Sequence, residues 1–269
     1  MPAFKSELYY GEKVIDELKG YKLMQVPDGY STGLRLAMRT TPYGEIVGAP
    51  AFPNELLIPQ DEWPDRIKEM EERKSRLSDI INAAGLPCKD QSTTSLCWAN
   101  APVHCVEIQR VVQNNSMVIL SPASVASPIT KFKNIGGWAE QAIEYLVENG
   151  ATPVDLWPAN AINKQYQTEE ARIAALDYKI SEWWELVPRN MNQLVSCLLR
   201  RIPVACGYNW QGHETVAIDA VWVNGEIGVR SRNSWSMNWP KPGAGGWYIL
   251  QGTKMRADDA ICPRVVTAS

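Results

Sequence analysis

One cysteine in the sequence stands where a nucleophile would need to stand. Cys97 follows a stretch containing Gly85, Pro87 and a polar Ser/Thr run, and it precedes apolar residues that recur at helical spacing. We therefore expect a helix over residues 96–113 with Cys97 in its first turn. Unpaired backbone N–H groups and the helix dipole favour thiolate over thiol there, and the thiolate is the nucleophile. A buried, inert thiol is the alternative that this stretch alone leaves open.

Three polar side chains elsewhere supply the types that a cysteine nucleophile requires. Gln91 lies six residues before Cys97 and carries an amide donor that a folded-back loop could aim at an oxyanion. His213 lies where a loop enters a predicted strand, and an imidazole takes a thiol proton near neutral pH. Asn233 follows a second strand-like run and can hold the ring by accepting from its other nitrogen. The set suits acyl transfer through a thioester.

This ordered set resembles the papain-like cysteine peptidases. The resemblance rests on the order Gln, Cys, His, Asn, with Trp98 directly after the cysteine and Trp235 two residues after the asparagine. It covers roughly residues 87–255. Further family landmarks follow in order: Leu120-Ser121-Pro122, Asn134-Ile135-Gly136-Gly137-Trp138, Ala142 to Gly150, and Gly245-Gly246-Trp247-Tyr248-Ile249.

The resemblance implies an α+β, two-lobed papain-like fold. A helical lobe would carry the nucleophile helix, and an antiparallel β lobe would carry His213 and Asn233, with the binding cleft at the seam. It implies that the Gln91 amide and the Cys97 backbone N–H form the oxyanion hole. Trp235 would shield the bond between His213 and Asn233, and Trp98 would pack behind the nucleophile.

The resemblance also implies where a peptide substrate binds. The backbone of the Gly136-Gly137 pair would form hydrogen bonds with an extended peptide, since a glycine lets another backbone approach closely. Trp138 would wall the adjacent pocket, and Gly212 would line the opposite side. The implied activity is that of a cysteine endopeptidase acting on peptide or protein substrates.

The sequence departs from the family pattern at several positions. Thr94 and Lys133 stand where the family usually has two cysteines that form a disulfide. Ser236 replaces the glycine after the Asn-Ser-Trp motif, and Lys241 to Ala244 form an insertion. Glu214 follows the histidine, where a small apolar residue is common. The catalytic residue types remain, but the shape of the cleft and hence the substrate preference differ from the pattern.

Composition limits the remaining functional classes. A net charge of −3 and a pI of about 5.6 argue against a nucleic-acid-binding surface. The N-terminus has no apolar signal core and no apolar run reaches membrane-spanning length, so we expect a cytoplasmic or virion-associated protein without a membrane partner. Six cysteines without a Cys-x-x-Cys pair predict free thiols and no metal or other cofactor. These features fit a disulfide-free, phage- or bacterium-encoded member.

The first 85 residues need a separate account. We expect residues 1–85 to form an N-terminal extension and residues 86–269 the peptidase domain. An amphipathic helix is predicted over residues 61–84, with Asp61 as N-cap, and we interpret it as a packing helix rather than an inhibitory propeptide helix. Val14 to Leu18 indicate a short helix and Leu34 to Arg39 a strand. The extension could inhibit, dock a protein partner or pack.

The remaining elements follow from periodicity. Helices are expected over 138–148, 171–178 and 191–199, and strands over 203–208, 215–223, 226–230 and 247–250, with Asn224-Gly225 as a hairpin turn. Trp183 and Trp184 are interpreted as packing or interface residues rather than catalytic ones. His104, two helical turns from Cys97, is interpreted as structural because helix rise places it about 10 Å away.

Two other functional classes stay open. One is a catalytically idle papain-like structural or interaction protein, for example in a virion. The other is a thiol acyltransferase or amidase with the same triad. Many such enzymes have Asp at the position of Asn233, so the asparagine favours a peptidase.

Overall fold

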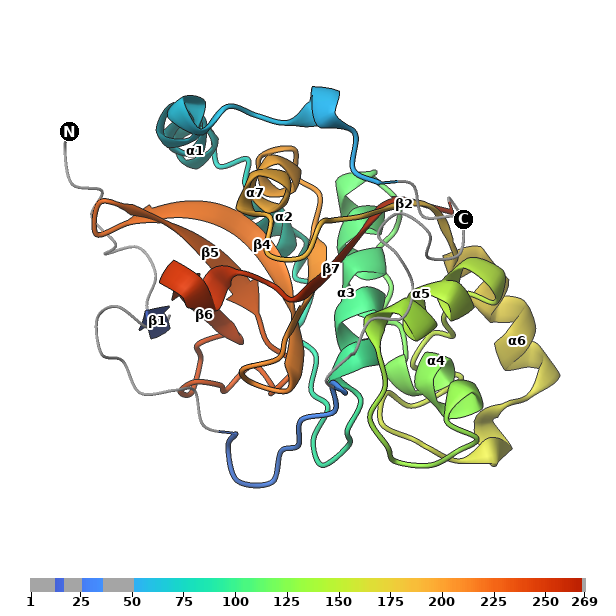
Figure 1. Ribbon diagram of the computed structural model, residues 1–269. Helices are drawn as coiled ribbons and strands as arrows, with labels where there is room; N and C mark the ends of the chain where they lie inside the picture. The colour runs from blue at the N-terminus through green and yellow to red at the C-terminus, as the bar shows by residue number, and fades with distance from the viewer. Residues whose placement is uncertain (1–12, 17–25, 36–50, 268–269) are drawn as a thin grey trace.

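A seven-stranded sheet forms one half of the molecule (Figure 1). The computed structural model describes residues 13–16, 26–35 and 51–267. Within them the strand order is β1-β6-β5-β4-β3-β7-β2; β1 pairs with β6 in parallel and every other pair is antiparallel. The strands are β1 (Lys13–Asp16), β2 (Ile180–Glu185), β3 (Val204–Tyr208), β4 (His213–Val223), β5 (Glu226–Arg232), β6 (Trp247–Gln251) and β7 (Asp259–Val266).

The helices lie on both sides of this sheet. They are α1 (Trp63–Glu72), α2 (Leu77–Ala84), α3 (Cys97–Val112), α4 (Pro122–Ile129), α5 (Ala139–Glu148), α6 (Glu169–Ala175) and α7 (Met191–Leu199). Short 3₁₀ helices span Asn54–Leu56, Gln60–Glu62, Lys164–Tyr166, Leu176–Tyr178 and Gly252–Met255. In Figure 1, α3 stands between the sheet on one side and α4, α5 and α6 on the other. The α+β class expected from the sequence is confirmed.

Strand alternation divides β4 between two packing environments. Val216 and Ile218 pack with Ala101 and Cys105 of α3, whereas Ala217 joins the core on the other face of the sheet. Successive side chains of a strand point to opposite faces, so the even-numbered residues at the start of β4 face α3. The register shifts after Ala217, and Ala220 joins the core on the other face. The turn after β4 is the predicted hairpin, with φ of 55° at Asn224 and 82° at Gly225, as a type I′ turn requires.

Helix α3 is the centre of the molecule. Its residues from Cys97 to Arg110 are all buried, because the sheet covers one side and α4 and α5 the other. Burial of a side chain such as Ile108, which is fully inaccessible, stabilises the fold by about 1.5–3 kcal/mol relative to exposure. The helix begins at Cys97, as the sequence predicts, and this rigid packing fixes the thiol at its N-terminus.

Several sequence predictions need correction. The single helix expected over 61–84 is two helices, because the chain breaks at Lys74, whose φ is 49°, and Arg76 then caps α2 through Asp79. A short helix was expected over Val14 to Leu18. The structure instead places Lys13–Asp16 in strand β1, and residues 17 and 18 lie outside the described residues. Leu34 forms an isolated bridge, and the rest of the strand expected over 34–39 lies outside the described residues beyond Arg35.

Two strands were missed altogether. Trp183 and Trp184 belong to β2, which pairs with β7 at the edge of the sheet, where the sequence indicated a mainly helical region. Both tryptophans are buried, so their interpretation as packing residues is confirmed. Among the described helices, none combines the length and the apolar character that a membrane span requires.

Candidate active site

Cys97 lies at the start of α3 with its sulfur sealed from solvent. Its side chain has no accessible surface, and the sulfur accepts a hydrogen bond from the backbone N–H of Gly33 at 3.2 Å. Trp98 follows, also inaccessible, and packs under Gly137 so closely that an added Cβ there would lie 2.7 Å from its ring. The N-terminal thiol position and the tryptophan behind it are therefore as predicted.

His213 is the first residue of β4 and is held on two sides. Its Nε2 lies 2.8 Å from Oδ1 of Asn233, the residue directly after β5. Its ring stacks on Trp235 with centroids 4.4 Å apart and planes inclined by 22°. Nδ1 has no hydrogen-bond partner in the part of the chain that the structure describes. One nitrogen is thus fixed and the other is available for a proton.

Gln91 has the orientation that an oxyanion-hole amide would need. Its Oε1 accepts from the hydroxyl of Ser234 at 2.6 Å, and its backbone N–H donates to the Ser234 carbonyl at 2.8 Å. The amide Nε2 donates to the carbonyl of Thr94 at 2.9 Å and to the carbonyl of Ser31 at 2.7 Å. A carbonyl oxygen of the chain itself therefore sits where Gln91 would stabilise an oxyanion.

Residues 26–35, which we call the covering segment, run across this site. Gly33 contacts the sulfur, and its carbonyl accepts from Gly137 N–H at 3.0 Å. Arg35 N–H donates to the Gly137 carbonyl at 3.1 Å, and Leu34 N–H donates to the carbonyl of Gly212 at 3.2 Å. The bridge between Leu34 and Gly137 is parallel. The backbone groups predicted to bind substrate are thus occupied by the protein's own chain.

The neighbouring predicted residues also touch the covering segment. A Cβ at Gly136 would overlap the carbonyl oxygen of Gly33, so only glycine permits this approach. The Arg35 guanidinium lies 5.4 Å from the ring centre of Trp138. Trp235 Nε1 donates to the Ser31 carbonyl at 3.4 Å. The structure thus brings the four predicted substrate-binding residues and the two tryptophans to one place.

Burial dominates the electrostatics of the covered site. It raises the pKa of the Cys97 thiol to about 12, with the nearby Glu214 as the next cause. Burial also lowers the pKa of His213 to about 4, against the opposing effect of its bond to Asn233. In this covered state both groups are neutral at pH 7, because a low-dielectric surrounding disfavours either charge.

The sequence did not indicate the buried polar group around His104. His104 Nδ1 lies 2.7 Å from Glu107 Oε2, and Glu107 forms an ion pair with Lys89. Lys89 also donates to the carbonyl of Leu120 at 2.6 Å. The structural role predicted for His104 fits this arrangement. The spacing of three residues between His104 and Glu107 on one helix was the available signal.

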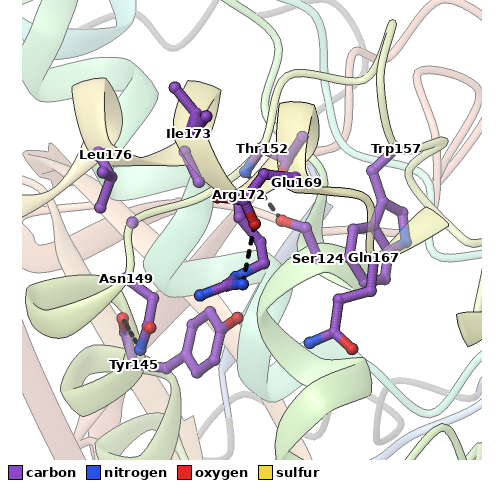
Figure 2. Close-up of a pocket in the computed structure, with 12 residues that line it drawn as sticks. Ser124, Tyr145, Asn149, Thr152, Trp157, Gln167, Glu169, Arg172, Ile173 and Leu176 are labelled. Carbon is purple, nitrogen blue, oxygen red and sulfur yellow. Dashed lines mark hydrogen bonds and ion pairs between the residues drawn. The ribbon is translucent and has the colours of Figure 1, made fainter.

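A further cavity lies in the helical lobe, away from the thiol. It has a volume of about 110 Å³ and is bordered by α5, α6 and the loop that follows α5. Figure 2 shows the Arg172 side chain reaching to Glu169, a 3.0 Å ion pair, above the ring of Tyr145. Both charges of that pair are largely exposed and neutralise each other, so the cavity offers no group prepared for a reaction. Across the described ranges, no cluster of three His, Cys, Asp or Glu side chains could hold a metal ion.

Comparison with known proteins finds one matching family and several similar solved structures. A family model described as papain family cysteine protease matches residues 78–220. No curated protein sequence matches the chain. The similar solved structures include digestive procathepsin L 3 from the larval midgut of Tenebrio molitor, with a TM-score of 0.56 and 19% identity over 66% of this chain and 66% of that one.

Two further solved structures give the same result. Xylellain, a cysteine protease from Xylella fastidiosa, has a TM-score of 0.55 and 18% identity over 68% of this chain and 83% of that one. The ragweed pollen allergen Amb a 11, a cysteine protease in its proform, has a TM-score of 0.54 and 18% identity over 68% of this chain and 63% of that one. This chain thus spans about two thirds of the procathepsin and of the ragweed proform. The two-lobed fold expected from the sequence is confirmed.

Proposed function

Because the chain belongs to the papain family of cysteine proteases, we propose that it is a cysteine endopeptidase that acts through Cys97, His213 and Asn233. The observation that carries this proposal is the 2.8 Å bond between His213 Nε2 and Asn233 Oδ1, while Nδ1 has no hydrogen-bond partner among the described residues. Cys97 contacts Gly33 of the covering segment, and Trp235, on which His213 stacks, contacts Ser31 of the same segment. A nucleophile, a base and an orienting amide are the parts that thiol-dependent acyl transfer requires.

The proposed reaction proceeds in two acyl transfers. His213 Nδ1 takes the thiol proton as the Cys97 sulfur attacks the peptide carbonyl carbon. The Gln91 amide and the Cys97 backbone N–H stabilise the oxyanion. His213 then gives its proton to the amine nitrogen as the C–N bond breaks, leaving a thioester. Water attacks the thioester, its proton passes to His213, and the carboxylic acid leaves as the thiol re-forms.

The covering segment supports this assignment and adds a condition to it. The Ser31 carbonyl oxygen lies 2.7 Å from Gln91 Nε2, within the range for an oxyanion-hole donor. Gly33, Leu34 and Arg35 occupy the backbone groups of Gly137 and Gly212 that would bind substrate. We therefore infer that the segment must leave the cleft before a substrate enters. Its departure would also return water to the thiol and so lower the Cys97 pKa.

A single substitution should release the segment. A Cβ added at Gly33 would overlap the carbonyl oxygen of Ser95, which is backbone and cannot move aside. Gly33→Ala should therefore dislodge the segment, and we expect hydrolysis of an unfolded protein such as casein at least about tenfold faster than by the unaltered chain. Asp28→Ala changes an exposed residue of the same segment and is the matched control.

The double variant Gly33→Ala, Cys97→Ala separates this activity from a contaminant and should hydrolyse nothing. If the folded Gly33→Ala protein labels at Cys97 but cleaves no peptide bond in casein or in a peptide library, the peptidase assignment is wrong. An acyltransferase or an idle scaffold then takes its place, distinguished by acyl transfer to an added amine.

A further inference from the structure

Three neighbouring positions form a row across the sheet beside the covering segment. Gly207 of β3 pairs directly with Glu214 of β4 on one side and with Asp259 of β7 on the other. Directly paired residues of antiparallel strands carry their side chains on the same face, with Cβ atoms about 5 Å apart. Two carboxyl-bearing residues therefore flank a position that has no side chain. This face of β4 is the one turned toward α3.

The gap above Gly207 is filled by Leu34. A Cβ at Gly207 would lie 3.1 Å from Leu34 Cδ2 and 3.4 Å from the Cβ of Asp259. The backbone of Leu34 is fixed at this place by its bond to Gly212 and its bridge to Gly137. The Leu34 side chain therefore stands on Gly207, between the positions of Glu214 and Asp259. We call this space the Leu34 pocket.

The buried carboxyl group of Glu214 lacks a hydrogen-bond partner among the described residues. Its side chain is fully buried, and within the described chain neither carboxyl oxygen has a hydrogen-bond partner. Burial raises its pKa well above the usual value, and the charges of Asp259 and Glu140 raise it further. An unpaired buried acceptor costs about 1–3 kcal/mol, more if it is charged. An aliphatic occupant such as Leu34 cannot reduce that cost.

We propose that the Leu34 pocket selects a lysine or arginine side chain of the peptide substrate, with Glu214 and Asp259 as its acceptors. The selection concerns the substrate residue that replaces Leu34 beside Gly137, and so it rests on the proposed peptidase function. A cation between two carboxyl groups gains charge-assisted hydrogen bonds and draws the proton from Glu214. Gly207 leaves room for a long, unbranched side chain. The apolar Leu34 is then a weaker occupant than the preferred substrate, which favours its displacement.

The covering segment itself provides the test, because it places a chosen side chain in the pocket of the full-length protein. Leu34→Lys introduces a cation, and Leu34→Met is the matched control of similar length without charge. Each is made in the unaltered chain and with Glu214→Gln. The readout is the rate at which iodoacetamide labels Cys97, mapped by mass spectrometry, since labelling requires the segment to leave.

With Glu214 present, Leu34→Lys should slow labelling about tenfold relative to Leu34→Met, because a charge-assisted bond is gained. With Glu214→Gln, the two rates should agree within about twofold. Comparing the two occupants within each background cancels the effect of Glu214 on the thiol itself. Equal rates with Glu214 present, or the same tenfold gap in both backgrounds, would overturn the proposal.

A substrate panel separates this inference from the proposed function. Peptides that vary one residue at a time between lysine, arginine, methionine, leucine and glutamate are offered to the Gly33→Ala protein. At one position the basic residues should raise kcat/KM about tenfold over methionine, and Glu214→Gln should abolish that preference. Cleavage that prefers an apolar residue at every position overturns the inference but leaves the peptidase function standing. Slow labelling with Leu34→Lys, combined with no cleavage of any peptide, supports the pocket and contradicts the peptidase function.

Discussion

The two histidines of the chain are both buried, but the groups around them differ. Burial lowers the pKa of each to about 4, and each ring has one bonded and one unbonded nitrogen within the described structure. His104 faces Glu107, which is paired with Lys89 inside the packed protein. His213 faces the uncharged amide of Asn233 and stacks on Trp235, at a cleft covered by residues 26–35.

The difference shows that burial does not by itself identify a reactive histidine. Around His104 the carboxylate of Glu107 and the ammonium of Lys89 balance each other, and all three residues are buried in the packed protein. Around His213 an amide fixes the ring without supplying a charge, so the free nitrogen can gain and lose a proton. The cover there is a segment whose described contacts are mainly backbone hydrogen bonds. Proton transfer by His213 requires an uncharged partner such as Asn233 to orient the ring, and a covering segment that can leave the cleft.

The largest expected effect comes from replacing each histidine in turn in the Gly33→Ala protein, whose cleft is expected to be open. In the Gly33→Ala background, His213→Ala should lower kcat/KM for peptide hydrolysis by at least about 10⁴-fold, since the base is lost. His104→Gln should lower it less than about fivefold while reducing the melting temperature, since Glu107 loses a partner. Steady-state kinetics with circular dichroism as a folding check measures both. Equal losses of activity from the two changes would erase the distinction between the regions.

Glu107 and Glu214, the glutamates near the two histidines, should affect the pH dependence of folding stability in opposite ways. Burial opposes ionisation of Glu107, but Lys89 and His104 outweigh it and lower its pKa. Burial raises the pKa of Glu214. A lowered pKa stabilises the fold above the unfolded value, near 4.3, and that contribution is lost as pH falls through the folded pKa. A raised pKa has the opposite sign, because the folded state holds its proton longer and stability declines as pH rises.

We therefore expect opposite pH trends from two matched substitutions. Glu107→Gln should destabilise the protein by about 3–5 kcal/mol near pH 7, since Lys89 is left buried and unpaired, and the loss should shrink toward acidic pH. Glu214→Gln should raise the melting temperature by a smaller amount that grows as pH rises above about 4.3. Thermal unfolding of both variants and the unaltered chain from about pH 2 to about pH 8 measures this. Trends of the same sign would contradict the assigned ionisation states.

The sequence predicted local backbone features better than it predicted the bounds and pairing of the elements around them. The start of α3 at Cys97 and the turn at Asn224 depend on local backbone requirements, which residue types report directly. The break between α1 and α2 was missed because the apolar pattern continues through Lys74. The edge strand β2 and its neighbour β7 were missed because their pairing is set by distant partners.

The covering segment was not predictable for a different physical reason. Its bonds to Gly137 and Gly212 use backbone groups, which leave no side-chain pattern in the sequence. Gly33 is required by the closeness of Ser95, a contact across 62 positions of the chain that no local rule reports. The acidic residue after the catalytic-type histidine was visible as a departure from the family pattern. Its meaning required the register that sets Glu214 opposite Gly207.

We infer that Cys97 is a nucleophile that the covering segment keeps buried and neutral until the segment leaves the cleft. The most direct measurement is the rate of Cys97 labelling at pH 7 by a thiol-selective epoxysuccinyl peptide, mapped by mass spectrometry. We predict slow labelling of the unaltered chain and of Asp28→Ala, labelling at least about tenfold faster in Gly33→Ala, and loss of that gain when His213→Ala is added. Fast labelling of the unaltered chain, or a Gly33→Ala protein that is folded and still labels slowly, would contradict the account.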